Sequence, residues 1–310
     1  MEISIFGAAI LASLAGVCFA GIGIAYRFGE PRGVSPMQSF FFASLIGAGW
    51  CLASGYGELS SAPWFFVPAA FALGLSQYLP VRLMQIILKL GPLSPMWSAL
   101  MLYFVPVILF SSLFLGEPFT LWNLSSVLAA VVAVLAAAVG GADSGPGRPA
   151  AGRRGRMVYG LLLLALLFAN CLLGMGQKLL ATLHTADGYN LMDRCGMLFL
   201  GVMYLGIALP LFVNVSVGKG WNFKSRMWPA VALLAAAGTV GGMMLQTFLL
   251  PYPAALYFTC SSSASVLFAA IFSAAIFREK RTKWWYATVG ATVLSILLTN
   301  GGTVCEKLCL

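Results

Sequence analysis

Charged residues are scarce in this sequence, and histidine is almost absent. Only 9% of the 310 residues are charged and 60% are hydrophobic, whereas soluble domains have about 25% charged and about 45–50% apolar residues. This balance excludes a water-soluble single domain. With one histidine, His184, and no HExxH or GxSxG motif, the sequence also lacks the common metal-dependent and nucleophilic catalytic patterns. We therefore expect no enzymatic activity, no catalytic residues, no metal and no cofactor.

Paired cysteines are also absent. The seven cysteines are scattered, mostly within apolar runs, with no CxxC spacing and no neighbouring histidine. This pattern predicts neither a disulfide framework nor a metal site. The cysteines are Cys18, Cys51, Cys171, Cys195, Cys260, Cys305 and Cys309.

Long apolar runs make up most of the chain. A transmembrane helix needs about 20 mostly apolar residues, and ten such runs lie between charged and turn residues. No positive segment precedes the first run, so we expect a retained helix and not a cleaved signal peptide. The sequence therefore predicts an all-α membrane protein with ten transmembrane helices. The runs cover residues 3–26, 35–55, 63–87, 93–115, 121–141, 157–181, 190–213, 228–250, 253–277 and 284–301.

The chain divides into two halves that resemble each other. A Gly-, Pro- and Arg-rich linker at 142–156 separates a first five-helix repeat at 1–141 from a second at 157–301, and a short tail follows at 302–310. Seven residues of the first half recur at a constant offset in the second, and a weaker echo relates Cys18, Gly21 and Gly23 to Cys171, Gly174 and Gly176. The seven are Glu117, Thr120, Trp122, Val127, Ala129, Val131 and Leu135, which correspond to Glu279, Thr282, Trp284, Val289, Ala291, Val293 and Leu297.

Basic residues are concentrated in alternate loops. The chain has 18 Lys and Arg against 9 Asp and Glu, a net charge of +9, and nearly all the cations flanking the runs fall in loops on one side, while the opposite loops carry Glu58, Glu117, His184 and Asp187. Because Lys and Arg resist translocation, this predicts cytoplasmic basic loops and both termini outside, in a bacterial-type inner membrane. Basic residues at membrane edges do not indicate a nucleic-acid partner. Five helices per repeat would place the halves antiparallel, as inverted repeats.

The ends of the fourth and ninth runs carry a family resemblance. Residues 106–120 (PVILFSSLFLGEPFT), residues 272–282 (FSAAIFREKRT) and Lys178 in GMGQKLL resemble EamA-type members of the drug/metabolite transporter superfamily. Two features depart from that pattern: Arg278 stands where the family usually has Gly before Glu, and Ala25 stands where a counterpart of Lys178 is expected. The resemblance implies a secondary transporter that works by alternating access, functional as a monomer, with a central cavity lined by the third, fourth, eighth and ninth helices and the first helix of each repeat.

Polar and aromatic side chains in those helices are the candidate binding residues, because polar groups facing lipid are costly. The Ser and Thr among them have an alternative use in packing helices together, as do Gly238 and Gly242. The candidate substrate-binding residues are Gln77, Tyr78, Arg82, Gln85, Trp97, Ser98, Tyr103, Asn170, Lys178, Gln246, Tyr257, Thr259 and Ser262.

Two cations carry the substrate hypothesis. Tyr78, Arg82 and Gln85 share one helical face, so Arg82 either faces an aqueous cavity or extends its side chain to the cytoplasmic surface. Lys178 and Asn170 lie on about the same face of their helix and either receive a carboxylate or phosphate, or Lys178 reaches the membrane interface. Glu117 and Glu279 are expected to cap helix ends or satisfy loops.

These features predict a secondary transporter for a small polar or amphipathic metabolite, such as an amino acid or another carboxylate- or phosphate-bearing compound. No ATP-binding motif is present. Two alternatives stay open: a quaternary amine or drug cation held by aromatic rings, and a lipid-carrier flippase. The expected partners are a small-molecule substrate and membrane lipid.

Overall fold

The computed structural model describes residues 4–29, 32–90, 93–142, 153–184, 188–218, 221–276 and 283–308, and within these ranges the regular structure is helical, without a β-strand. The helices are α1 (Ile5–Gly29), α2 (Pro36–Gly55), the 3-10 helix η2 (Tyr56–Ser61), α3 (Phe66–Ser76), α4 (Tyr78–Leu90), α5 (Leu93–Met101), α6 (Phe104–Phe114), α7 (Leu121–Ala142), α8 (Arg153–Ala181), α9 (Leu191–Val217), α10 (Trp228–Leu249), α11 (Ala254–Ile276) and α12 (Lys283–Leu308).

Several helices have the length and composition of membrane spans. Six segments in the described ranges qualify: Ile5–Gly29, Pro36–Ser61, Met157–Ala181, Leu191–Val217, Trp228–Leu249 and Ala254–Ile276. Large apolar side chains also cover the outside of the bundle; Phe114, Leu161, Phe168, Leu233 and Leu297 are each more than half exposed. Such a surface is unfavourable in water and favourable against lipid tails. The chain is an integral, all-α membrane protein.

Two apolar runs that the sequence analysis treats as single helices are each divided in two. Gln77 separates α3 from α4, and Leu102 and Tyr103 separate α5 from α6. The cause is a proline at the third position of each following helix, Pro80 in α4 and Pro106 in α6. Proline has no N–H to donate to the preceding turn and its ring collides with that turn, whereas the first turn of a new helix accommodates it.

The expected linker and tail differ in extent from the helices. Most of the linker, residues 143–152, lies outside the described residues, but α8 begins at Arg153 within the expected linker range. At the other end, α12 continues to Leu308, through most of the segment expected to be a short tail.

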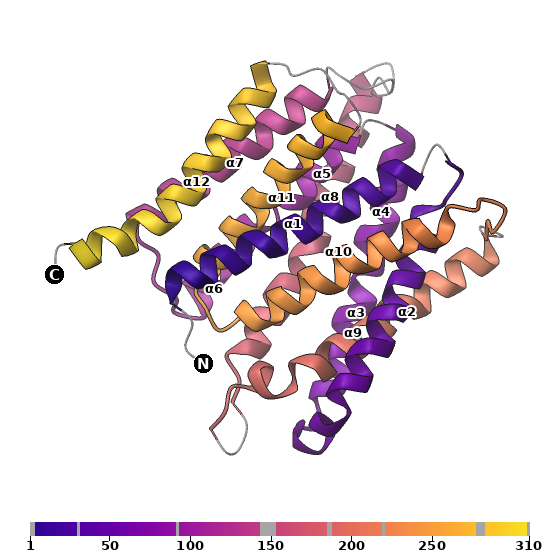
Figure 1. Cartoon of the computed structure of the whole chain (residues 1–310), viewed down its shortest axis with the longest axis horizontal. Helices are drawn as coiled ribbons and strands as arrows, with labels where there is room; N and C mark the ends of the chain where they lie inside the picture. The colour runs from indigo at the N-terminus through magenta and orange to yellow at the C-terminus, as the bar shows by residue number, and fades with distance from the viewer. Residues whose placement is uncertain are drawn as a thin grey trace.

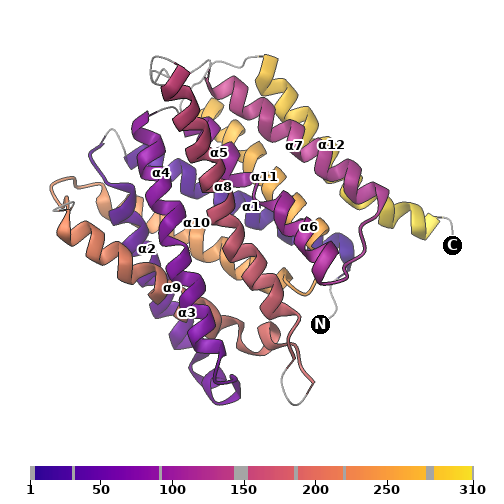
Figure 2. The ribbon, with the colours of Figure 1, turned by 180° about the vertical axis from the view of Figure 1, so that it is seen from behind.

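The helices surround a central space with different partners on each side. On the face shown in Figure 1, α1 lies beside α10 and α11; on the face shown in Figure 2, α8 lies beside α4 and packs against α5. The pair α7 and α12 forms one flank, and on the other α9 packs against α2 and α3. Both chain ends lie toward the same end of the bundle (Figure 1).

Small residues allow the closest helix contacts. A Cβ added to Gly238 of α10 would lie 2.6 Å from the carbonyl oxygen of Cys18 in α1, and one added to Gly242 would lie 2.5 Å from the ring of Phe19. Gly74 of α3 meets the backbone of α9 at Met203 in the same way. The GxxxG spacing at Gly238 therefore marks a close helix crossing, as its packing interpretation predicts.

Candidate functional site

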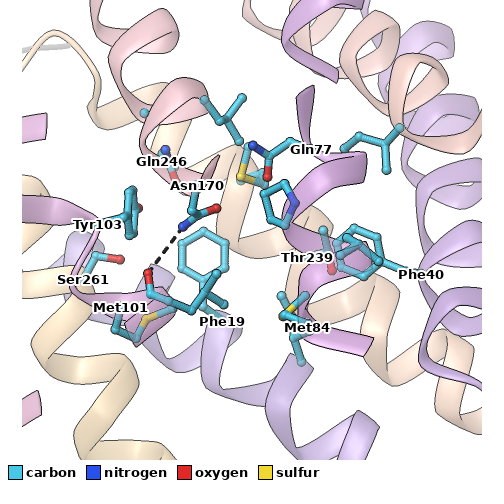
Figure 3. Close-up of a pocket in the computed structure, with 18 of the residues that line it drawn as sticks. Phe19, Phe40, Gln77, Met84, Met101, Tyr103, Asn170, Thr239, Gln246 and Ser261 are labelled. Carbon is cyan, nitrogen blue, oxygen red and sulfur yellow. Dashed lines mark hydrogen bonds between the residues drawn. The ribbon is translucent and has the colours of Figure 1, made fainter. Parts of the chain in front are cut away.

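A cavity lies at the centre of the bundle, where helices from the two halves of the chain meet (Figure 3). Its volume is about 110 Å³, several times the roughly 10–15 Å³ that one water molecule needs. The cavity is therefore large enough for several waters or a small organic group. The lining residues are Phe19, Ile22, Phe40, Gln77, Pro80, Val81, Met84, Trp97, Leu100, Met101, Tyr103, Asn170, Leu173, Gly174, Met203, Tyr204, Ile207, Thr239, Met243, Gln246, Ser261 and Ser262.

Both helix interruptions of the first half open onto this cavity. Gln77, between α3 and α4, is a lining residue, and so are Met101 and Tyr103 around the α5–α6 break. At the α5–α6 break, residues of α8 also bond to the backbone: Asn170 Nδ2 donates to the carbonyl of Leu100 at 3.4 Å, and Cys171 Sγ donates to the carbonyl of Tyr103 at 3.6 Å. Broken helices at the middle of a membrane are tolerated where they line a cavity or are buried in protein.

Three carboxamide side chains line the cavity, and they differ in whether their N–H groups already have hydrogen-bond partners. Figure 3 shows Gln77, Asn170 and Gln246 toward one side and Met84 and Met101 toward the other. Gln246 Nε2 donates to Gln177 Oε1 at 2.5 Å, and Asn170 is engaged at Leu100. Gln77 Nε2, in contrast, has no hydrogen-bond partner in the structure.

The indole of Trp97 has the same unsatisfied state as Gln77. Trp97 Nε1 is buried without a partner, and the two side chains are only 7% and 9% exposed. An unpaired buried donor costs about 1–3 kcal/mol, so a ligand oxygen that reached either N–H group would offset that cost. Gln77 lies between α3 and α4, and Trp97 lies in α5.

The remaining lining is apolar and adaptable. Aromatic rings from Phe19, Phe40, Trp97, Tyr103 and Tyr204 surround the space together with the thioethers of four methionines. Methionine side chains are flexible and polarisable, which suits a pocket that accommodates more than one ligand shape. Among the described residues that line this cavity there is no Asp, Glu, Lys, Arg or His. Elsewhere in the described ranges, no cluster of three His, Cys, Asp or Glu side chains forms a metal site.

Six of the residues singled out from the sequence lie in this cavity, and a seventh is not described beyond its backbone. The side chain of Ser98, in α5, is outside the described part of the structure. The six residues that the structure brings together are Gln77, Trp97, Tyr103, Asn170, Gln246 and Ser262.

The polar stripe of α4 lies outside the lining. The Tyr78 hydroxyl accepts a hydrogen bond from Asn214 Nδ2 of α9 at 2.7 Å. Arg82 Nη1 donates to Gln85 Oε1 at 2.6 Å, and both side chains are half-buried. The neighbouring face of the same helix, with Gln77, Val81 and Met84, is the one that meets the cavity.

Lys178 is buried away from the cavity and is fully engaged. Its ammonium forms an ion pair with Glu117 Oε1 at 2.5 Å and donates to the carbonyls of Leu250 and Tyr252, each at 2.9 Å. An ammonium has three protons, so no donor is left for a substrate. Glu117 Oε2 accepts from the backbone N–H of Ala254 at 2.7 Å and so caps the start of α11, which agrees with the capping expected of it. Glu279 lies outside the described residues.

Two further candidates from α11 point elsewhere. Tyr257 is 1% exposed and packs edge-on against Phe258, with ring centroids 4.7 Å apart. Thr259 is fully buried and is not a lining residue.

Sequence reasoning missed most of the apolar lining and the polar residues Tyr204, Thr239 and Ser261. Phe19, Met84 and Met243 have no feature that distinguishes them from lipid-facing residues in the sequence. Thr239 has such a feature, because the offset between Gln77 and Thr239 equals the offset between Glu117 and Glu279. Tyr204 lines the cavity and donates to the Thr239 carbonyl at 3.1 Å.

Comparison with known proteins shows the fold and no more. No family model matches the chain, and no curated protein matches it. A crystal structure of a protein superposes with a TM-score of 0.72 at 12% identity, covering 96% of this chain and 98% of that chain. At that identity, the likeness shows a shared fold over nearly the whole length. Fold and site together define the class: an integral membrane protein with a mixed polar and aromatic cavity at its centre.

Proposed function

We propose that the protein is a secondary transporter of the drug/metabolite transporter type, which moves a small solute through this cavity by alternating access. The observation that carries the proposal is the position of the cavity between the two halves of the chain, with lining residues from both. Secondary transporters built from repeats bind their substrates at such a junction, near interrupted helices.

The lining itself supports an internal repeat. One wall of the cavity includes Gln77, Val81 and Met84. The offset that separates Glu117 from Glu279 relates these residues, in order, to Thr239, Met243 and Gln246. Those three residues also line the cavity. The seven matching residues lie elsewhere in the chain, so this agreement supports the repeat independently. In a repeat of this register, equivalent positions of the two halves face the same space.

Helix packing follows the same relation. In the first half α1 packs on α10 and α11, and in the second half α8 packs on α4, α5 and α6. Helix α2 corresponds to α9, and α7 corresponds to α12. Each of these pairs packs together, so exchanging the two halves leaves both contacts unchanged. We take α3 with α4 as one membrane pass and α5 with α6 as another, which gives ten passes in two inverted five-helix repeats.

Orientation follows from the loop charges in this proposal. With Lys and Arg retained in the cytoplasm, both termini lie outside, and Glu58, Glu117 and Lys178 lie toward the outer end of the bundle. The membrane is then a bacterial-type inner membrane, and one polypeptide contains the complete site.

Polar contacts between the halves would form the two gates. At the outer end, Glu117 binds Lys178 and Ala254, and Glu58 Oε2 accepts from the N–H of Leu198 at 2.9 Å, beside a kink of α9 at Cys195. At the inner end, Gln38 Oε1 accepts from the N–H of Asn222 at 3.0 Å. Rocking of the halves would break one set while keeping the other.

The test is solute exchange in proteoliposomes. A thermal-shift screen of the purified protein selects a ligand, because a ligand that binds only the folded state raises its stability. Vesicles loaded with that ligand and diluted into a labelled trace should then accumulate the label transiently, by counterflow. A ligand that binds saturably but never exchanges across the bilayer would contradict transport.

A further inference from the structure

We propose that the cavity takes an uncharged, amphipathic solute that presents hydrogen-bond acceptor oxygens, such as an amide, ketone or ester, and not an organic acid or an amine cation. This inference names the substrate class of the proposed transporter, and the binding step of the argument depends only on the cavity.

The cavity has no counter-charge for an ionic ligand in the part of the chain that the structure describes. No acidic or basic side chain is among the described residues that line it. The two cations that favour an acidic substrate in the sequence are used elsewhere, Arg82 at Gln85 and Lys178 at Glu117. A charged ligand would enter a low-dielectric space without a partner, which is strongly unfavourable.

The polar groups left unpaired at the cavity are hydrogen-bond donors. The amide N–H of Gln77 and the indole N–H of Trp97 are both donors, both more than nine-tenths buried and both without a partner, and each belongs to a residue that lines the cavity. A ligand oxygen with lone pairs satisfies such groups. A cationic ammonium, whether it carries protons or methyl groups, has no lone pair to offer and leaves both donors unpaired.

The surface around these donors is apolar. Rings of Phe19, Phe40 and Tyr103 and the side chains of Met84 and Met243 contribute an apolar wall. Small-molecule sites of this type combine an apolar lining with a few fixed polar groups that orient the ligand. The expected solute therefore has an apolar or aromatic body and a neutral polar head.

The experiment uses three probes with one ring and different heads: benzamide, benzoate and benzyltrimethylammonium. The full-length protein is purified in detergent, and its melting temperature is followed as each probe is titrated to its solubility limit. We expect saturable stabilisation by benzamide and none by the two ions. Equal or larger stabilisation by benzoate or the cation, or no stabilisation by benzamide, would overturn the inference.

Variants locate the binding groups. Gln77→Leu and Trp97→Phe each remove one unpaired donor while keeping the bulk, and each should raise the apparent Kd for benzamide about tenfold, as expected for the loss of one hydrogen bond. Trp122→Phe is the matched control, because Trp122 lies on α7 with a side chain 42% exposed, away from the cavity. If both donor variants bind benzamide like the control, the inference is wrong even though the site is occupied.

Counterflow with labelled probes separates this inference from the proposed function. Binding of benzamide without exchange across vesicles would support the ligand class and refute transport. Binding and exchange of benzoate would support transport and refute the ligand class.

Discussion

At the scale of single residues, the buried cation Lys178 is engaged by the protein itself. Lys178 is only 3% exposed, and its three protons are taken by Glu117 and two backbone carbonyls that follow α10. Such a pair ties α8 to the loop before α7 and to the start of α11. Its consequence is structural, because removing one member leaves a charge and several backbone groups without partners.

We predict that Lys178→Met lowers the free energy of unfolding by about 3 kcal/mol, the lower end of the range for broken buried pairs because Glu117 is one-fifth exposed. Denaturant unfolding in detergent measures the change. Adding Glu117→Gln to Lys178→Met should restore part of the loss, and the exposed Lys224→Met is the control. Wild-type stability in Lys178→Met would contradict this account.

The residue-scale lesson of the sequence concerns which face of a helix matters. Spacing correctly places Tyr78, Arg82 and Gln85 along one side of α4, but helical periodicity does not say whether that side meets the cavity. The structure gives that position to Gln77, Val81 and Met84. The two sets of residues differ by a one-residue shift around the axis of α4. Packing of α4 against α8 and α9 determines which set meets the cavity.

We predict that Arg82→Gln leaves the Kd of a bound neutral ligand within about twofold of wild type, because Arg82 contacts Gln85 and not the cavity. Titration of the variant against benzamide by thermal shift is the measurement. A tenfold weaker Kd would return Arg82 to the binding site.

At the scale of elements, the packing depends on backbone contact between helices. Gly238 brings α10 against the backbone of α1, and Gly74 brings α3 against α9. These crossings set the distance between the walls of the cavity, because Phe19 of α1 and Thr239 of α10 both line it. Glycine spacing predicts that close contacts exist, but the partner helix follows only from the fold.

Two glycines of α10 provide a matched pair of substitutions. We predict that Gly238→Ala destabilises the protein by about 1–3 kcal/mol, as overpacking does, because its Cβ would lie 2.6 Å from the Cys18 carbonyl oxygen. Gly241→Ala meets nothing closer than Cys18 Sγ at 3.5 Å and should be neutral or slightly stabilising through helix propensity. The measurement is the thermal unfolding midpoint of each variant. Equal midpoints would contradict the close contact between α1 and α10 at Gly238.

At the scale of the whole molecule, the membrane class and the helical content are evident from composition and apolar runs. The division of two runs at Gln77 and at Leu102 and Tyr103 was not expected, although Pro80 and Pro106 stand just after the breaks. A proline alone does not distinguish a kink, a break and a first turn; the outcome depends on how neighbouring helices pack, such as the contacts that Asn170 and Cys171 of α8 make with the backbone at the second break. Long-range contacts of this kind are not encoded in any local pattern.

The central claim is that the cavity opens alternately to the two sides of the membrane, and thiol accessibility tests it without a known substrate. In a background with the seven cysteines replaced, Ser262→Cys places a thiol in the cavity, and Ser263→Cys is the control because Ser263 donates to Ser295 Oγ of α12 and lies outside the lining. An impermeant maleimide should label Ser262→Cys both in right-side-out and in inverted vesicles, and leave Ser263→Cys unlabelled. Labelling of Ser262→Cys from one side only, or from neither, would contradict alternating access.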